Sequence, residues 1–149
     1  MSTVGAPARS ETVDTPFGAM TVDAATEIHF PSGIPGFEAC RRFVVLSPQE
    51  LGAFSCLHSL VGPAASFLVI DPRRVVPQYR CAVNQSDLAR LGAGADTVLL
   101  WLALVSFDAD GQAYANLRAP IVINPERMLG YQVMPHNSLY PLRHPLASE

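Results

Sequence analysis

The sequence predicts a mainly β protein: a small single domain with one short helix, built as an antiparallel sandwich or barrel. Three observations lead to this prediction. Roughly nine short segments have strand character, turn residues recur about every ten positions, and one segment carries clear helix signals. Strands alternating with long helices would indicate a βαβ fold, and the sequence does not have that pattern.

A sharp bend between two strands is predicted within residues 114–124, which read YANLRAPIVIN. Residues 121–123 are all β-branched and favour a strand. Pro120 lacks a backbone N–H, so it must mark a strand start, an edge or a bulge. Asn124 and Pro125 then end the run, because a residue before proline avoids the helical region.

The first elements expected along the chain are a hairpin and a half-buried strand. Residues 11–22 alternate loosely around a turn at 15–18, which predicts the hairpin. Residues 23–26 form a connection. Residues 27–30 then alternate polar and apolar side chains, as a half-buried strand does.

Residues 30–38 are predicted to be an ordered loop, because two prolines and two glycines hold its backbone in irregular conformations. Ile34 and Phe37 are apolar, so we expect them to plug one end of the core. The alternative is an exposed recognition loop.

The middle of the chain is predicted to be strand-rich, with one helix. Asn84 can cap that helix over residues 84–92, Asp87 opposes the positive end of its dipole, and Gly92 suits its end. Residues 73–78 are expected to be an irregular connection. The predicted strands are 42–47, 54–61, 66–70 and 79–83.

A long apolar run, residues 97–107, could by periodicity be a helix or a buried strand. Its neighbours and the turn at 108–111 favour a central strand paired with residues 113–118. Residues 130–134 form the last predicted strand. Residues 135–148 contain three prolines and are expected to lie extended across the surface.

Composition excludes several classes of protein. The chain has 149 residues, of which 49% are hydrophobic and 15% charged, so it is not disordered and some apolar surface is expected to be covered by a partner. All ten basic residues are arginine, and the net charge of −3 does not fit a nucleic-acid binder. Mild acidity fits either a basic protein partner or an ordinary surface.

The chain has no apolar run of the roughly 18 residues that a membrane helix needs. Residues 1–10 lack a signal peptide's apolar segment and are expected to be a flexible tail, with residues 11–149 forming the single domain. Cys40, Cys56 and Cys81 contain no C-x-x-C pair. They are predicted to be reduced, partly buried thiols of a cytoplasmic protein.

No catalytic or metal-binding set is recognisable. The histidines show no ligand spacing and are interpreted as surface or tail residues: His29, His58, His136 and His144. Ser55 and Ser59 lack a nucleophile elbow, and Asp108 and Asp110 fit a turn. We therefore expect a non-enzymatic binding domain without a cofactor or a metal.

Six motifs in order resemble the flagellar assembly factor FliW family. They are FPSGIPGFE at 30–38, LHS at 57–59 ahead of FLVIDP at 67–72, ANLRAPIVIN at 115–124, GYQV at 130–133 and YPLR at 140–143. The resemblance covers roughly residues 11–146. Three positions depart from the family pattern: His58 replaces a common Gln, Tyr114 a usual Thr and Tyr131 a usual Arg.

The resemblance implies a mainly β fold, a small antiparallel β-barrel-like single domain. It also implies a cytoplasmic, chaperone-like factor that binds flagellin and the translational repressor CsrA. Flagellin would compete with CsrA for the factor, and this competition would couple free flagellin to translation of its mRNA. No direct contact with nucleic acid or membrane is implied. An acidic face would steer the encounter with CsrA, which is basic.

Four residues are predicted to contact partners. Asp71 and neighbouring acids are assigned to the CsrA contact, and the corner at Asn116 and Leu117 to part of a partner surface. Gln132 is the fourth predicted contact residue. The alternative for Asn116 is a turn or bulge side chain, and for Gln132 an ordinary strand residue. Two other functions remain open: a small-ligand or flavin-binding β-barrel enzyme, and a structural module of the flagellar apparatus.

Overall fold

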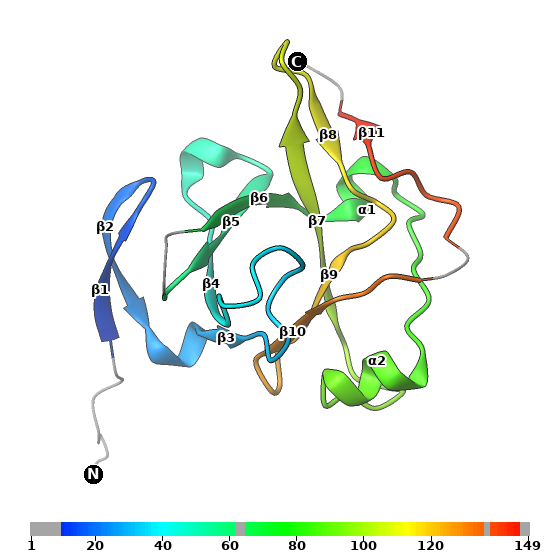
Figure 1. Ribbon diagram of the computed structural model, residues 1–149, viewed down its shortest axis with the longest axis horizontal. Helices are drawn as coiled ribbons and strands as arrows, with labels where there is room; N and C mark the ends of the chain where they lie inside the picture. The colour runs from blue at the N-terminus through cyan, green and yellow to red at the C-terminus, as the bar shows by residue number, and fades with distance from the viewer. Residues whose placement is uncertain (1–9, 62–64, 136–137, 147–149) are drawn as a thin grey trace.

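A closed ring of strands forms the body of the protein (Figure 1). The computed structural model describes residues 10–61, 65–135 and 138–146. The mainly β, barrel-like prediction is confirmed. The ring runs from β7 (Leu100–Phe107) through β6 (Ser66–Ile70), β5 (Phe54–Ser59), β4 (Arg42–Leu46), β3 (Ile28–His29), β10 (Leu129–Gln132) and β9 (Ile121–Asn124) back to β7.

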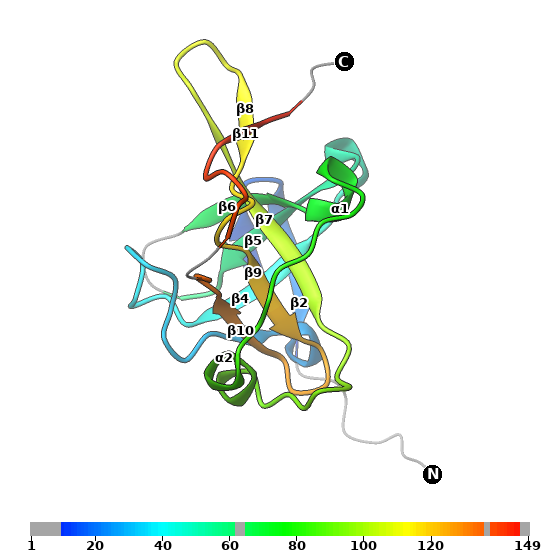
Figure 2. The same ribbon diagram turned by 90° about the vertical axis from the view of Figure 1, so that its right-hand side faces the viewer.

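Four strands lie outside the ring. β8 (Ala113–Ala115) pairs with the distal half of β7, and β11 (His144–Pro145) pairs with β8. Figure 2 shows the β7–β8 arm projecting beyond the ring. The predicted N-terminal hairpin is confirmed as a separate two-stranded sheet, β1 (Ser10–Thr15) and β2 (Gly18–Asp23). The expected tail of residues 1–10 lies outside the described residues except for Ser10, which begins β1.

Strand pairing is antiparallel except between β3 and β10, where Leu129 lies opposite His29 in a parallel pair. The antiparallel prediction holds for the other pairs among the described strands, and this pair is the exception. A hairpin forces neighbouring strands to run in opposite directions, whereas β3 and β10 are far apart in the chain and no short turn constrains them.

The bend predicted at residues 114–124 is confirmed. β8 ends at Ala115, the chain turns through residues 116–120, and β9 follows. Pro120 sits before the strand, where its missing N–H costs no ladder bond, and its carbonyl accepts a hydrogen bond from Val133 N at 2.9 Å. β9 is buried along its whole length.

The helix prediction is right for one segment and incomplete for another. α2 (Gln85–Arg90) begins at Asn84, which caps it through its side-chain oxygen, together with Asp87. Residues 72–75, expected to be irregular, form α1 (Pro72–Val75), with the Asp71 side chain accepting a hydrogen bond from Arg73 N. An aspartate before a proline is an N-cap signal as well as a strand terminator, and here the cap is realised.

The strand predicted at residues 79–83 is wrong. These residues pair with no strand in the described part of the protein. Tyr79 is instead buried as a single anchor, and its hydroxyl donates to Leu117 O at 2.7 Å. Burial raises the pKa of this hydroxyl, with a further contribution from the neighbouring Cys81. Because its buried side chain holds Tyr79 in place, this segment does not need to pair with a neighbouring strand.

Two of the connections are short 3₁₀ turns. The 3₁₀ turn η2 (Ala24–Thr26) links β2 to β3, and η3 (Gln49–Leu51) links β4 to β5. Among the described residues, no helix is long and apolar enough to cross a bilayer. The three cysteines are free, as predicted, with Cys40 and Cys56 buried.

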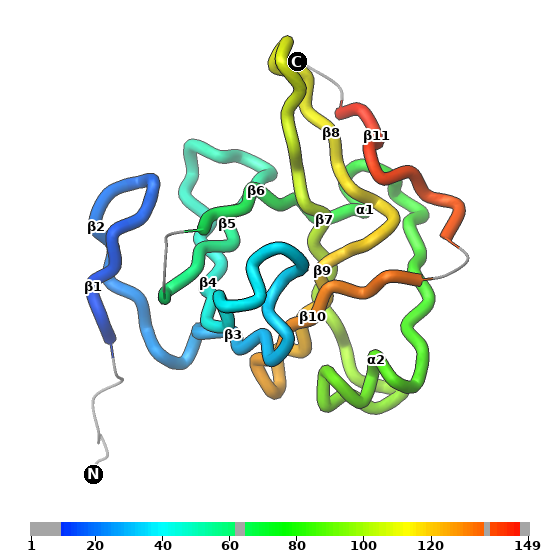
Figure 3. Tube along the Cα trace, in the orientation of Figure 1, coloured from blue at the N-terminus to red at the C-terminus, as the bar shows by residue number. Residues whose placement is uncertain are grey.

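The loop of residues 30–38 closes over the middle of the ring (Figure 3). Ile34 is buried against the ring interior, as expected, together with Phe30, Phe43 and Leu57. The same expectation for Phe37 is wrong, because 44% of its surface is exposed. Its ring packs edge-on against Phe67 at 5.0 Å instead, and so lies on the rim of the interior.

His58 corrects the interpretation of the histidines as surface or tail residues. It lies on β5 with only 2% of its surface exposed. Its Nε2 lies 3.1 Å from the carbonyl oxygen of Asp14, which can only accept, so Nε2 carries the proton. Nδ1 then accepts from Ser66 Oγ at 2.6 Å. His29 is exposed, His144 is half-buried and His136 lies outside the described residues.

This histidine joins the β1–β2 hairpin to the ring, so its removal should loosen the hairpin. We expect His58→Ala to lower the free energy of unfolding by about 1.5 kcal/mol, since it leaves a cavity and two polar groups without their partner. His58→Gln, which keeps an amide donor, should lose less. Urea denaturation with amide exchange of β1 measures both. Equal losses in the two variants would contradict the bridging role.

A second link to the hairpin is ionic. Arg42 on β4 donates to Glu27 at 2.7 and 2.8 Å and to Glu11 of β1 at 3.2 Å. The hydrogen bond from Arg42 lowers the pKa of Glu27, against a smaller opposing effect of burial.

Ionised Glu27 stabilises the folded protein, and this stabilisation is fully present at pH values above the pKa that Glu27 has in the unfolded chain. It is lost as the pH falls through the lowered folded pKa. Glu27→Gln should therefore cost about 1 kcal/mol near pH 7 and almost nothing near pH 3. Denaturation across this range tests the prediction, with Glu11→Gln as the exposed control. A loss that does not change with pH would refute it.

Candidate partner-binding groove

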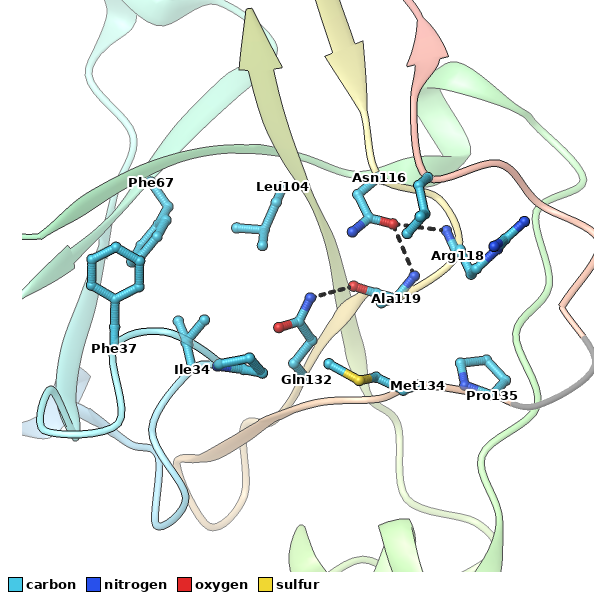
Figure 4. A pocket seen from close by; sticks show the side chains of 12 residues that line it. Ile34, Phe37, Phe67, Leu104, Asn116, Arg118, Ala119, Gln132, Met134 and Pro135 are labelled. Carbon is cyan, nitrogen blue, oxygen red and sulfur yellow. Dashed lines mark hydrogen bonds between the residues drawn. The ribbon is translucent and has the colours of Figure 1, made fainter.

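A groove of about 440 Å³ opens on one face of the ring (Figure 4). Its walls come from segments distant in sequence: the loop of residues 30–38, β6, β7, the bend after β8, and the residues beyond β10. The apolar lining consists of Ile34, Pro35, Phe37, Phe67, Leu104, Ala119, Met134, Pro135 and Leu142. Phe37, Met134 and Leu142 are all exposed, so the groove is joined to an apolar rim.

Two amide side chains stand on one wall of this groove, and both are bonded to the backbone of Ala119. Asn116 Oδ1 accepts from Arg118 N at 3.1 Å and from Ala119 N at 3.0 Å. Gln132 Nε2 donates to Ala119 O at 2.9 Å. One residue of the bend therefore holds both side chains in place.

These bonds determine which way each amide points. A backbone N–H can only donate and a carbonyl can only accept, so Asn116 must turn its oxygen to the bend and Gln132 its nitrogen. Asn116 Nδ2 and Gln132 Oε1 then face away from the bend, toward the apolar lining (Figure 4).

Arg118 is the one charged residue among the described residues that line the groove. Its Nε donates to Tyr140 O at 3.0 Å, which positions the guanidinium at one end. The groove is therefore locally cationic in a protein whose formal net charge is −3.

The structure brings together two of the four predicted contact residues and separates the others. Asn116 and Gln132 share the groove. Leu117 is completely buried beside Tyr79, so a direct contact to a partner is excluded for its side chain. Strand and bend alternation places Leu117 on the core side while its neighbours face outward.

Asp71 lies elsewhere, at a second apolar hollow of about 370 Å³. It is exposed, and Leu100 and Trp101 of β7 line the same hollow. Leu100 and the nearby Val98 are large exposed apolar residues. The two hollows share only β7, through Leu104 in the groove and residues 100–102 here.

Sequence reasoning missed Arg118, Met134 and Leu142 as groove residues. Each is exposed and comes from a different segment, so no spacing in the sequence connects them. The one feature of the sequence that could have revealed them is the excess of apolar residues in the loop and the C-terminal segment. Such an excess indicates apolar surface that a partner covers.

The departures from the FliW pattern lie outside this groove. Tyr131 accepts a hydrogen bond from Arg90 Nη1 at 2.7 Å, and the Arg90 guanidinium lies 4.9 Å from its ring centre. Tyr114 donates to Asp108 at 3.0 Å and lies beneath Arg143. Both tyrosines therefore take part in local cation–π contacts with an arginine.

The chemistry that this arrangement offers is recognition. In the described residues, no three His, Cys, Asp or Glu side chains are close enough together to hold a metal ion. The groove contains amides, one arginine and apolar surface, and no acid–base pair among its lining residues.

Comparison with known proteins gives one consistent result. The family model described as FliW protein matches residues 11–146. The chain is 33% identical to the "Flagellar assembly factor FliW" of Geotalea uraniireducens over 132 residues, which represent 88% of this chain and 80% of that protein. It is 34% identical to the protein of the same name from a Thermotoga species, over 91% of this chain and 92% of that one.

A solved structure agrees with these relatives. The chain superposes on a structure titled "Crystal structure of the flagellar assembly factor FliW" with a TM-score of 0.82. The match covers 95% of this chain and 99% of the other, at 28% sequence identity.

Proposed function

This chain belongs to the FliW family, and from that premise we propose that it is a flagellar assembly factor whose groove binds flagellin. The observation that carries the proposal is the groove itself. It combines an apolar lining, an exposed apolar rim and two amides held rigidly by the bend. Proteins in water rarely leave a contiguous apolar surface exposed unless a partner covers it.

The second part of the proposal is that the factor also antagonises CsrA in the cytoplasm, with Asp71 at the contact. Asp71 is exposed beside the second apolar hollow, and the protein is acidic. Opposite charges raise the rate of encounter between two proteins. Flagellin and CsrA are expected to exclude one another through β7, the strand that lines both hollows, so that free flagellin releases CsrA to repress translation.

Binding titrations with purified flagellin and CsrA test the proposal. We expect Met134→Glu, which places a charge on the exposed rim of the groove, to weaken flagellin binding about tenfold or more. Asp71→Asn keeps the cap of α1 but removes the charge, and should weaken CsrA binding mainly at low salt. Each variant is the control for the other partner.

Two outcomes would contradict the proposal. The first is flagellin binding that Met134→Glu leaves unchanged, which would place the contact outside the groove. The second is a stable complex that contains the factor, flagellin and CsrA together, which would end the switch. A chromophore that co-purifies with the protein would instead favour the alternative of a small-ligand or flavin-binding enzyme.

A further inference from the structure

Gln132 is more than nine-tenths buried, and yet one of its polar atoms is not used within the protein. Only 8% of its surface is exposed, and its Nε2 bonds to Ala119 O. Its Oε1 has no hydrogen-bond partner among the described residues. Because no fully buried side-chain oxygen or nitrogen among the described residues lacks a partner, this oxygen is accessible to solvent. Gln132 lines the groove, and Figure 4 shows its oxygen directed into the groove, away from Ala119.

Asn116 supplies the complementary group. Its oxygen is occupied by two backbone N–H groups, so its Nδ2 is the atom left for a ligand. The wall therefore presents one acceptor and one donor, each in an orientation set by the backbone of Ala119. Figure 4 shows the oxygen of Gln132 and the nitrogen of Asn116 both directed away from that residue.

A donor and an acceptor on an apolar wall match the backbone of an extended peptide. An extended segment that enters such a groove loses water from its N–H and C=O groups and needs both partners. The interior of a helix satisfies these groups itself and would leave the two amides unpaired. Unpaired polar groups in a covered groove are unfavourable.

Arg118, at one end of the groove, selects the charge of the ligand. Arg118 uses only Nε within the described residues, which leaves both terminal nitrogens of its guanidinium for a ligand. No carboxylate lies among the other residues that line the groove. A guanidinium in this position pairs best with a carboxylate.

We propose that the groove recognises an extended, largely apolar peptide segment of its partner. Gln132 Oε1 accepts from a backbone N–H of the segment, Asn116 Nδ2 donates to a backbone carbonyl oxygen, and Arg118 pairs with an acidic group near one end. The inference rests on the proposed function in taking the groove as the binding surface, and adds the conformation and chemistry of the bound segment.

A random library of linear peptides of about twelve residues, displayed on phage, tests the inference without assuming which protein is the partner. The bait is the full-length protein. We expect enrichment of apolar sequences with Asp or Glu at one end. The enrichment should disappear with Asn116→Asp, which keeps the acceptor for the bend but removes the donor, and with Arg118→Gln.

Synthetic peptides then test each contact by fluorescence anisotropy. Methylating one backbone nitrogen should weaken binding to the wild type about tenfold and leave binding to Gln132→Met nearly unchanged. Replacing the acidic residue of the peptide by its amide should likewise weaken binding to the wild type and leave binding to Arg118→Gln nearly unchanged. Melting curves of every variant show that it is folded.

Three results would overturn the inference. The first is a library that the wild type enriches no more than the variants do, and the second is a gain of helix by the peptides on binding, measured by circular dichroism. The third is that methylation or amidation of the peptide weakens binding to the wild type and to the variants equally. None of these depends on flagellin. If flagellin binds and the peptide couplings are absent, the proposed function stands and this inference fails. If peptides bind as described and flagellin does not, the inference stands and the proposed partner is wrong.

Discussion

Replacing Gly33 by alanine is expected to lower the free energy of unfolding by about 3 kcal/mol. Gly33 has a φ of +65°, a conformation that disfavours any residue with a Cβ. A Cβ at this position would also lie 2.6 to 2.9 Å from backbone atoms of Glu38. Backbone atoms cannot rotate away, so the loop must shift.

The loop forms one wall of the groove, so this variant should also weaken partner binding. Gly36→Ala is the matched control. Gly36 lies in the same loop with a φ of +88°, but a Cβ there would meet nothing within 4 Å. It should cost about 1 kcal/mol from backbone strain alone. Urea denaturation measures both variants, and equal losses would show that the contact with Glu38 is unimportant.

Gly130→Ala should have a comparable effect, about 3 kcal/mol, for a different reason. Gly130 lies in β10 with an ordinary strand backbone, so strain in φ plays no part. A Cβ would lie 2.6 and 2.8 Å from Cε1 and Cε2 of Phe30, and closer still to Cζ. Phe30 is completely buried and packs edge-on against Phe43 at 5.0 Å, so its ring has no free space to enter.

A second substitution separates this contact from other effects. Phe30→Leu in the Gly130→Ala background should restore part of the stability, because the smaller residue makes room for the new methyl group. Gly94→Ala is the neutral control, since its Cβ would meet only Thr97 Oγ1 at 3.9 Å. Thermal denaturation should show a decrease of about 10 °C for Gly130→Ala alone. Losses in the double variant equal to the sum of the single ones would contradict a direct clash.

Two predictions from local sequence patterns were wrong: the irregular connection at α1 and the surface position of His58. Asp71 and Pro72 end a strand and also start a helix, and both uses have the same sequence signal. His58 occupies a strand position where a polar residue normally faces solvent. The β1–β2 hairpin covers it, and that covering depends on a contact between residues 44 positions apart.

The candidate site was predictable in part. The predicted bend pointed to Asn116 and the motif at residues 130–133 contained Gln132, and the structure places both on one wall of the groove. Leu117 shares the same bend but faces the core. The direction of a side chain at a bend depends on backbone angles that short motifs do not specify, so adjacent residues were assigned the same role.

The order of turns, β-branched runs and prolines in the sequence determined by itself that this protein folds as a small, mainly β domain with one short helix, because those signals act over a few neighbouring residues. Its motifs added the resemblance to the FliW family, and with it the barrel-like form. Closure of the ring decided the rest. The parallel β3–β10 pair, the burial of His58 and the meeting of the loop, the bend and the C-terminal segment in one groove all join residues far apart in sequence. Such contacts form only when the barrel packs, since burial of apolar surface across the whole domain selects them.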